Sequence, residues 1–425
     1  MTTFTIARIW RDAAWQPLDD MTLERKRVAI LGAGIMGTSL ALFLARRNVD
    51  VSLFEKEDTP VACASRWNEG KIHLGYLYGA DPSMRTALHL LPGGLAFGGL
   101  ISELVGSSIA PHTTPDDDIY LVHRRSVVDA DALASSFDKI SALVREHAGA
   151  GDYLADVSAA RARPLSLGEL RHLTDSDEIV AGFLTPERSV NTRWVADGLC
   201  AALQNEPRIR LRTSVTIQHA GPVNSVDGQW RVRGESELDE RFDVVVNALW
   251  NGRLEIDRAA GVQPQPGWSH RYRLCVFART RDVVDIRSAV VAVGPFGDIK
   301  NYNGRDFYLS WYPVGLMAES DAVSLETPQP LTGTERERFI ANVRAALGSI
   351  IPPTTQIFES AEELKVEGGF VFALGRGSIG DPASTLHRRD RFGVHRLGRY
   401  FSVDTGKYST APWLAKNLAK EICGD

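Results

Sequence analysis

The sequence of 425 residues is poor in cysteine and lacks the cysteine pairs that hold metals or build disulfide frameworks. No CxxC pair occurs, so neither a zinc site nor a disulfide scaffold is indicated, and we expect no metal. Such cysteine usage fits a reducing compartment best, which predicts a cytoplasmic protein. The four cysteines are scattered over the chain, as Cys63, Cys200, Cys275 and Cys423.

Long apolar runs and an excess of basic charge are also missing. No stretch of about 20 apolar residues occurs, so no membrane span is expected. The formal net charge of -5 argues against a nucleic-acid partner, which normally needs a basic stripe to neutralise phosphates. The sequence does not indicate how many subunits assemble.

Residues 1–24 form an extension before the first recognisable strand. They carry Arg11 and Asp12 and lack an apolar run, which argues against a secretory signal. Trp10 and Trp15 suggest that this extension packs on the body of the protein.

Residues 27–47 carry the pattern of a dinucleotide-binding unit. A short apolar run at 28–31 leads into Gly32-Ala33-Gly34-Ile35-Met36-Gly37, and a helical pattern follows. Gly32 permits the tight turn, Gly34 lets the backbone approach a pyrophosphate, and Gly37 lets the helix pack closely on the strand. The N-terminus of that helix then directs free N–H groups and its positive dipole end at the phosphates.

A second strand is expected at 49–54, and it ends at Glu55, about 20 residues past the glycines. A carboxylate at this place accepts hydrogen bonds from the ribose hydroxyls of adenosine and disfavours a 2′-phosphate, and so NADP. Lys56 follows directly and is a further expected cofactor contact. Together these features predict a bound dinucleotide without deciding between FAD and NAD.

After this unit the chain leaves the regular βαβ pattern for an irregular segment, which includes Asn68-Glu69-Gly70-Lys71-Ile72-His73-Leu74-Gly75-Tyr76-Leu77-Tyr78. Here the sequence resembles the D-amino-acid oxidase superfamily of FAD enzymes, and most of all its L-2-hydroxyglutarate branch. That branch has serine at the position of Glu69 and alanine at the position of Leu74, so the identity of the substrate does not carry over. The resemblance implies non-covalent FAD, with these contacts in the segment: Ser65, Arg66, Asn68 and Gly70.

The resemblance continues in three later places and spans most of the chain. Residues 166–170 and 187–204 are similar to the family segment that re-enters the cofactor domain, and Val215 is an expected contact beyond it. Residues 242–248 are similar to the buried strand under the flavin. There Ala248-Leu249 replaces the family's Ala-Gly pair, Trp250 follows, and close approach to the cofactor is expected to shift to Gly252.

The third place, residues 400–412, is similar to the strand, loop and helix that close over the isoalloxazine in this family. The implied contacts are Gly406, Lys407, Tyr408, Ser409 and Thr410. A second helix N-terminus behind a loop of small residues suits a polar or partly anionic ring edge, which a nicotinamide enzyme does not need. An ordinary last strand and helix is the alternative interpretation of this run.

The resemblance implies an α/β fold, in which a Rossmann-like FAD-binding domain of the D-amino-acid oxidase (DAO) type carries an inserted antiparallel-sheet substrate domain. The cofactor domain is expected at 25–111, 165–263 and 375–425, and the substrate domain at 112–164 and 264–374. Alternating patterns at 269–279 and 306–313 predict strands, and helical patterns at 131–148 and 334–347 predict helices that cover them.

His73 is the best candidate for a catalytic base. Its unperturbed pKa lies near neutrality, and the resembled motif places a histidine here. Lys71 lies two residues earlier, on the same side of an extended segment, and offers a positive charge near the reduced flavin. Each has a purely structural alternative: a satisfied core histidine for His73 and a surface lysine for Lys71. Lys407 has the same two interpretations as Lys71.

A carboxylate substrate favours a bidentate arginine, because the guanidinium fork matches two oxygens. Alternation on the strand at 270–277 places Arg271 and Arg273 on one face, and we expect Arg273 to anchor the substrate. Exposure at the edge of the sheet is the alternative interpretation for either arginine. On the next strand, Tyr308, Ser310 and Tyr312 share a face that either meets the ligand or belongs to the sheet.

The sequence therefore predicts an FAD-dependent oxidase or dehydrogenase acting on a CH–OH or CH–NH group of a small substrate, such as a 2-hydroxy or 2-amino acid. One alternative keeps the flavin but moves the substrate to a sugar-linked or other bulky biosynthetic intermediate. Another is a redox-silent subunit that only binds the nucleotide. A thioether from Cys275 to the flavin has no support in its sequence context.

Overall fold

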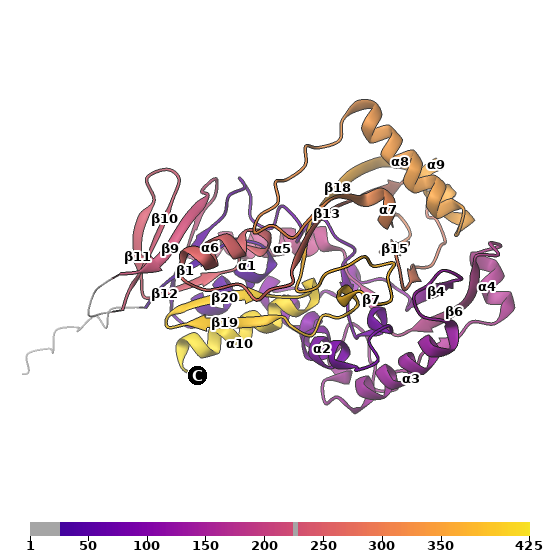
Figure 1. The fold of residues 1–425 in the computed structure, drawn as a ribbon, viewed down its shortest axis with the longest axis horizontal. Helices are drawn as coiled ribbons and strands as arrows, with labels where there is room; N and C mark the ends of the chain where they lie inside the picture. Colours follow the sequence, from indigo (N-terminus) through magenta and orange to yellow (C-terminus); the bar gives the residue numbers. More distant parts are fainter. Residues whose placement is uncertain (1–25, 224–227) are drawn as a thin grey trace, which may run out of the picture.

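The computed structural model describes residues 26–223 and 228–425. The N-terminal extension, with the packing expected for Trp10 and Trp15, lies outside the described residues. Two large sheets organise the chain, one in each half of the view in Figure 1. The helices are α1 (Ile35–Ala45), α2 (Arg85–Val105), α3 (Ala130–Glu146), α4 (Leu167–Leu173), α5 (Thr192–Gln204), α6 (Arg253–Ala259), α7 (Tyr312–Gly315), α8 (Gly333–Gly348), α9 (Thr355–Glu359) and α10 (Ala411–Cys423).

The six-stranded sheet has the order β19-β20-β12-β1-β2-β8, and all neighbours except β19 and β20 pair in parallel. Its central strands are continuously apolar because both faces are covered, one by helices and the other by a small three-stranded sheet together with α6. Helices α1 and α10 lie side by side on it (Figure 1). The strands are β1 (Arg27–Leu31), β2 (Asp50–Phe54), β8 (Ile209–Arg212), β12 (Val244–Asn247), β19 (Gly393–Leu397) and β20 (Tyr400–Asp404).

The nine-stranded sheet has the order β17-β13-β16-β15-β14-β4-β6-β5, and β18 pairs with β13. The expected antiparallel arrangement holds except for β4 and β14, which pair in parallel. The strands are β4 (Asp118–His123), β5 (Arg163–Pro164), β6 (Ile179–Thr185), β13 (Ser269–Thr280), β14 (Ala289–Ala292), β15 (Gly297–Asn301), β16 (Asp306–Trp311), β17 (Leu316–Ser320) and β18 (Ala361–Ala373).

Two small sheets complete the described part. A three-stranded sheet of β9 (Ile217–Pro222), β10 (Trp230–Gly234) and β11 (Asp239–Phe242) lies at the far end of the cofactor half (Figure 1). The irregular loop at 63–70 is called the cofactor loop. A two-stranded ribbon of β3 (Lys71–Ile72) and β7 (Arg188–Ser189) follows it.

Two local expectations need correction. The strand expected at 306–313 ends at Trp311, and Tyr312 begins the short helix α7, where Pro313 needs no N–H partner. Residues 165–185 were expected in the cofactor domain, yet β6 pairs with β4 and β5 in the nine-stranded sheet. Because β6 has a paired strand on each side, it belongs to the nine-stranded sheet and not to the six-stranded sheet of the cofactor domain.

Helix α2 is long and apolar enough to cross a membrane by length and composition alone. In the structure 56% of its 18-residue window is buried, and the helix packs against α5 and α10. This burial is what a core helix shows, and one such helix is weak evidence for a membrane span.

Candidate active site

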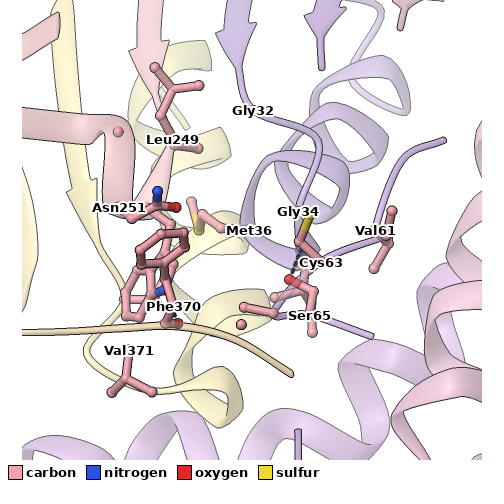
Figure 2. Close-up of a pocket in the computed structure, with 18 of the residues that line it drawn as sticks. Gly32, Gly34, Met36, Val61, Cys63, Ser65, Leu249, Asn251, Phe370 and Val371 are labelled. Carbon is pink, nitrogen blue, oxygen red and sulfur yellow. Dashed lines mark hydrogen bonds between the residues drawn. The ribbon is translucent and has the colours of Figure 1, made fainter. Parts of the chain in front are cut away.

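An elongated cavity of about 630 Å³ runs between the carboxyl ends of the parallel strands and the nine-stranded sheet. A ligand site at this edge is typical of open α/β sheets. Figure 2 shows wall residues from both halves of the molecule, including Gly34 and Ser65 on one side and Leu249 and Phe370 on the other. Fifteen of the expected cofactor contacts line it: Gly32, Gly34, Ile35, Met36, Glu55, Lys56, Ser65, Asn68, Val215, Ala248, Leu249, Trp250, Gly406, Lys407 and Tyr408.

The glycine turn at the end of β1 shows why these residues are needed. Gly32 has a φ of +96°, and a Cβ there would lie 2.8 Å from the carbonyl oxygen of Ala248. A Cβ on Gly37 would lie 1.9 Å from the carbonyl oxygen of Gly32. The N-terminus of α1 can therefore approach the strand closely and open onto the cavity, as the sequence predicted.

Side chains hold this turn in place. The carboxylate of Glu55 accepts hydrogen bonds from the N–H groups of Ala33 (2.8 Å) and Glu57 (3.1 Å), and it also borders the cavity. The hydroxyl of Ser65 accepts from the N–H of Ile35 (3.0 Å) at the start of α1. Glu55 and Ser65 thus combine a structural role with a position suited to a ribose or a phosphate.

Six expected cofactor contacts do not line the cavity. Ala33 and Gly37 shape the glycine turn from behind it, and Gly70, Ser409 and Thr410 are buried in the loops around it. The guanidinium group of Arg66 forms an ion pair with Asp197 instead. These six residues were expected as contacts from the glycine pattern and from the family resemblance, and their contact with the cofactor stays a prediction.

Trp250 joins the two halves of the molecule. Its indole N–H donates a hydrogen bond of 2.8 Å to the carbonyl oxygen of Phe370 on β18. Its φ of +57° is unusual for a bulky side chain. Gly252, to which we expected close approach to shift, also borders the cavity.

His73 lies at the inner end of the cavity and is almost completely buried. Burial, together with the positive charges of Lys407 and Lys71, lowers the pKa of His73 well below its usual value. Its Nδ1 atom has no hydrogen-bond partner among the described residues. The ring of Tyr78 lies beside it, with the ring centroids 5.8 Å apart. A neutral imidazole with a free nitrogen is therefore available here as a proton acceptor.

Lys71 belongs to a buried ionic cluster that links the two halves. Asp118 on β4 accepts hydrogen bonds from the ammonium groups of Lys71 and Lys300, the latter at 2.6 Å. Glu187 lies 3.6 Å from Lys71. Although burial opposes it, the carboxylates of Asp118 and Glu187 raise the pKa of Lys71. Lys71 is thus a buried cation at the cavity wall and not a surface residue.

Glu187 also fixes the segment that carries His73. One oxygen of its carboxylate accepts hydrogen bonds from three consecutive N–H groups, those of Leu74 (2.7 Å), Gly75 (3.0 Å) and Tyr76 (3.2 Å). The Tyr153 hydroxyl donates to the carbonyl oxygen of Ile72 at 2.5 Å. The backbone on both sides of His73 is therefore held by buried hydrogen bonds.

The face of the nine-stranded sheet that turns toward this region carries further polar groups. Ser310 on β16 donates to Asp298 on β15, and the thiol of Cys275 donates to the hydroxyl of Tyr308 at 3.2 Å. Arg273 lies over the ring of Tyr312 at 4.6 Å. Arg273 and Tyr308 do not line the cavity described above. We therefore call this polar surface, formed by Arg273, Cys275, Asp298, Lys300, Tyr308 and Ser310, the inner face.

Sequence reasoning missed Asp118, Asp298 and Lys300, although a signal was present. Asp298 and Lys300 alternate with apolar residues on one short strand, and Asp118 opens a strand that is otherwise apolar. A charge in such a strand indicates a buried, paired group. The two partners of Asp118, Lys71 and Lys300, lie 47 and 182 residues away along the chain, which periodicity cannot show.

The cysteines give no support to a covalent flavin link. Cys275 is buried away from the cavity, and burial raises the pKa of its thiol to about 11. Cys63 does border the cavity, but burial and the neighbouring Glu57 raise the pKa of its thiol to about 12. A protonated thiol is a poor nucleophile.

The site fits FAD on observations of this chain. The N-terminus of α1 opens onto one part of the cavity, and the loop before α10 opens onto another. Buried polar atoms without partners among the described residues, His73 Nδ1 and the Tyr408 hydroxyl, belong to wall residues. A phosphate-binding turn at one part of the cavity and a buried, charged wall at another are what an FAD-dependent oxidoreductase needs.

Comparison with known families agrees. The family model described as FAD dependent oxidoreductase (DAO) matches residues 27–361, which is most of the chain. The chain therefore belongs to the DAO family of FAD-dependent oxidoreductases. The protein is an FAD-dependent enzyme.

Solved structures show the same fold. Glycine oxidase from Geobacillus kaustophilus is 16% identical and superposes with a TM-score of 0.65, over 94% of this chain and 95% of that chain. Iminodiacetate oxidase from Chelativorans sp. BNC1 is also 16% identical, with a TM-score of 0.64 over 94% and 96% of the two chains. L-alpha-glycerophosphate oxidase from Mycoplasma pneumoniae, solved with FAD bound, is 14% identical, with a TM-score of 0.60 over 94% of each chain.

Proposed function

We propose that the protein oxidises a small 2-amino or 2-hydroxy acid at the carbon that bears the nitrogen or oxygen. The observation that carries this proposal is the neutral, buried His73 at the inner end of the cofactor cavity, beside the cations Lys71 and Lys407. This arrangement offers a proton acceptor and a positive environment in one place. A protein that only stores a nucleotide needs neither.

Arginine side chains on β13 suit the carboxylate of such a substrate. Arg271 and Arg273 each have an Nε atom that is buried and has no partner among the described residues. An unpaired guanidinium N–H in a buried place is costly unless a ligand accepts from it. Arg271 donates to the Tyr312 hydroxyl at 3.1 Å, and Arg273 lies over the ring of the same tyrosine. Contacts with Tyr312 therefore hold both guanidinium groups in place.

The proposed reaction removes a hydride and a proton from the substrate. Bound FAD supplies the acceptor for the hydride and for its two electrons. His73 accepts the proton from the substrate's nitrogen or oxygen, and a C=N or C=O double bond forms. The substrate is oxidised by two electrons, and atoms and charges balance.

Lys71 and Lys407 hold positive charge around this step. Lys407 lies with its Nζ atom 5.4 Å from the centre of the Tyr78 ring, on the loop that precedes α10. Two fixed cations favour negative charge that develops nearby during the reaction, because they are already in place and partly shielded from water. They also keep His73 neutral before the substrate binds.

The L-2-hydroxyglutarate branch remains the nearest resemblance of the motif around His73. Glu69 and Leu74 depart from that branch, so we propose only the wider class of small 2-amino and 2-hydroxy acids. Among the structural neighbours, the glycine and iminodiacetate oxidases act on amino acids by their names, which fits the amino half of this class.

Anaerobic reduction of the flavin tests this function. The holoenzyme is mixed with single amino and hydroxy acids under nitrogen, and loss of the flavin absorbance is followed in time. We expect at least one small acid to bleach the flavin completely, and sugar derivatives without a carboxylate to leave it oxidised. Bleaching by sugar derivatives alone would support the bulky biosynthetic substrate, and no bleaching by any compound would support a redox-silent subunit.

A further inference from the structure

Glu69 lies where the cofactor loop meets the inner face. The ring of Trp67, two residues earlier, packs on Phe277 with the centroids 5.1 Å apart. The hydroxyl of Tyr302 donates to the carbonyl oxygen of Glu69 at 3.1 Å. Glu69 borders the cavity together with His73. The loop is thus fixed on the sheet, and Glu69 is placed at the cavity wall near the proposed base.

The carboxylate of Glu69 makes no hydrogen bond or ion pair with another residue in the described part of the chain. Burial opposes its ionisation, yet the positive charges of Lys407 and Arg273, with the residue's own N–H, lower the pKa of Glu69 below its usual value. Glu69 therefore keeps its negative charge in the site, and its carboxylate oxygens stay open to hydrogen-bond donors of a ligand.

A second carboxylate stands near the first. Asp298 lies on β15, where the hydroxyl of Ser310 donates to it at 2.5 Å. Burial raises the pKa of Asp298, and the charge of Glu69 adds to this rise. The lowered pKa of Glu69 and the raised pKa of Asp298 make Glu69 the member of this pair that keeps its negative charge. A hydroxyl group can donate one neutral hydrogen bond to this carboxylate, whereas an ammonium group donates a stronger, charge-assisted one.

We propose that Glu69 is a specificity-determining residue that receives the cationic ammonium group of the substrate, so that the site prefers a 2-amino acid to the 2-hydroxy acid with the same side chain. This inference rests on the proposed function. A bound 2-amino acid is a zwitterion, and we expect its carboxylate to contact Arg273 and its ammonium group to contact Glu69. Glu69 is also one of the two positions at which the motif departs from the hydroxy-acid branch.

The chemistry stays balanced with Glu69 in this role. His73 would accept one proton from the ammonium group, FAD when bound would accept the hydride of the adjacent carbon, and a C=N bond would form. The product is an iminium ion with the same charge as the bound ammonium. Glu69 remains ionised throughout, so it attracts both the substrate and the product without exchanging a proton.

Matched pairs of acids test the inference. Wild-type holoenzyme and the Glu69→Gln and Glu69→Ser variants are titrated with alanine and lactate, and with glutamate and 2-hydroxyglutarate, each as both enantiomers. Binding is read from the perturbation of the flavin spectrum at equilibrium, and reduction from anaerobic bleaching. We expect the wild type to prefer the amino acid of a pair, and each variant to lose about tenfold or more of that preference, mainly through weaker binding of the amino acid.

Glu362→Gln is the matched control, because it removes the same charge from an exposed position on β18. It should leave the preference unchanged, and a normal flavin spectrum shows that each variant is folded. A wild type that prefers hydroxy acids, or variants that keep the wild-type preference, would overturn the role of Glu69. If no acid bleaches the flavin but amino acids still bind better and the Glu69 variants lose this, the proposed function fails and the role of Glu69 stands.

Discussion

The two walls of the cavity are built in different ways. On the cofactor side the wall is formed mainly by backbone atoms, namely the turn at Gly32 and Gly37 and the first N–H groups of α1. On the side of the inner face, charged side chains from separate strands form the site, as in the buried pairs of Asp118 with Lys71 and Lys300.

The two walls should therefore respond differently to amino-acid substitutions. A backbone site is specified by a short local pattern and binds a part of the ligand that is common to many proteins. A side-chain site depends on which strands lie together and can change its substrate by single substitutions. We therefore expect substitutions on the first wall to affect cofactor retention and those on the second to affect catalysis and substrate choice.

Substitution of His73 should have the strongest effect, because it should slow flavin reduction without loss of FAD. Replacing it with glutamine removes the proton acceptor, and we expect the rate of anaerobic flavin reduction to fall by about 10²–10⁴-fold. FAD content should stay at the wild-type level, measured by absorbance after gel filtration. His172→Gln at an exposed position is the control. An unchanged rate would show that His73 is only a core histidine.

A second prediction concerns the buried ionic cluster around Asp118, which joins Lys71 to Lys300 of the inner face. Asp118→Asn leaves Lys71 and Lys300 buried next to each other without their shared carboxylate, and we expect the free energy of unfolding to drop by roughly 3–5 kcal/mol. Chemical denaturation of the holoenzyme measures this. Asp116→Asn breaks only a long ion pair to Arg287 at the surface and should cost less than about 1 kcal/mol. Equal losses in the two variants would contradict the assigned importance of the cluster.

Gly37→Ala tests the first wall. The added Cβ meets the carbonyl oxygen of Gly32, so the turn must open, at a cost of roughly 1–3 kcal/mol. We expect weaker FAD binding, measured by flavin fluorescence on dilution, and an unchanged preference among substrates in the fraction that retains FAD. Gly99→Ala in α2 is the control, because a Cβ there meets no atom within 4 Å. A normal FAD affinity for Gly37→Ala would contradict the role of the turn.

The smallest expected effect is a shift in the pH profile. Burial lowers the pKa of His73 below its usual value of 6.5, so the imidazole stays neutral and active as the pH falls through that value. We expect the acid limb of kcat/KM to lie below pH 6.5 and to disappear in His73→Gln. An acid limb at or above pH 6.5 would mean that the cations around His73 do not act on it in the holoenzyme.

The cofactor wall could be predicted from the sequence because its signals are local. The strand, glycine turn and helix at 27–47 appear as β1 and α1, and the helix expected at 192–204 coincides with α5. The motif around His73 also pointed to a segment that borders the cavity. All of these depend on neighbours within a few tens of residues.

The inner face could not be predicted in the same way. Asp118, Asp298 and Lys300 meet only because β4, β14, β15 and β16 pair across long separations, which the pattern of one strand does not encode. The same reason explains the placement of 165–185, where β6 follows its partner β4. Tyr312 departed from its strand because a proline follows it.

The central claim is that the cofactor cavity and the inner face form one site for a small acid. A difference absorption spectrum of the oxidised holoenzyme on addition of propionate, which lacks a group to oxidise, tests it most directly. The account predicts a saturable change in the flavin bands for the wild type and weaker binding by about tenfold or more for Arg273→Met. No spectral change in the wild type, or the same affinity in both proteins, would contradict it.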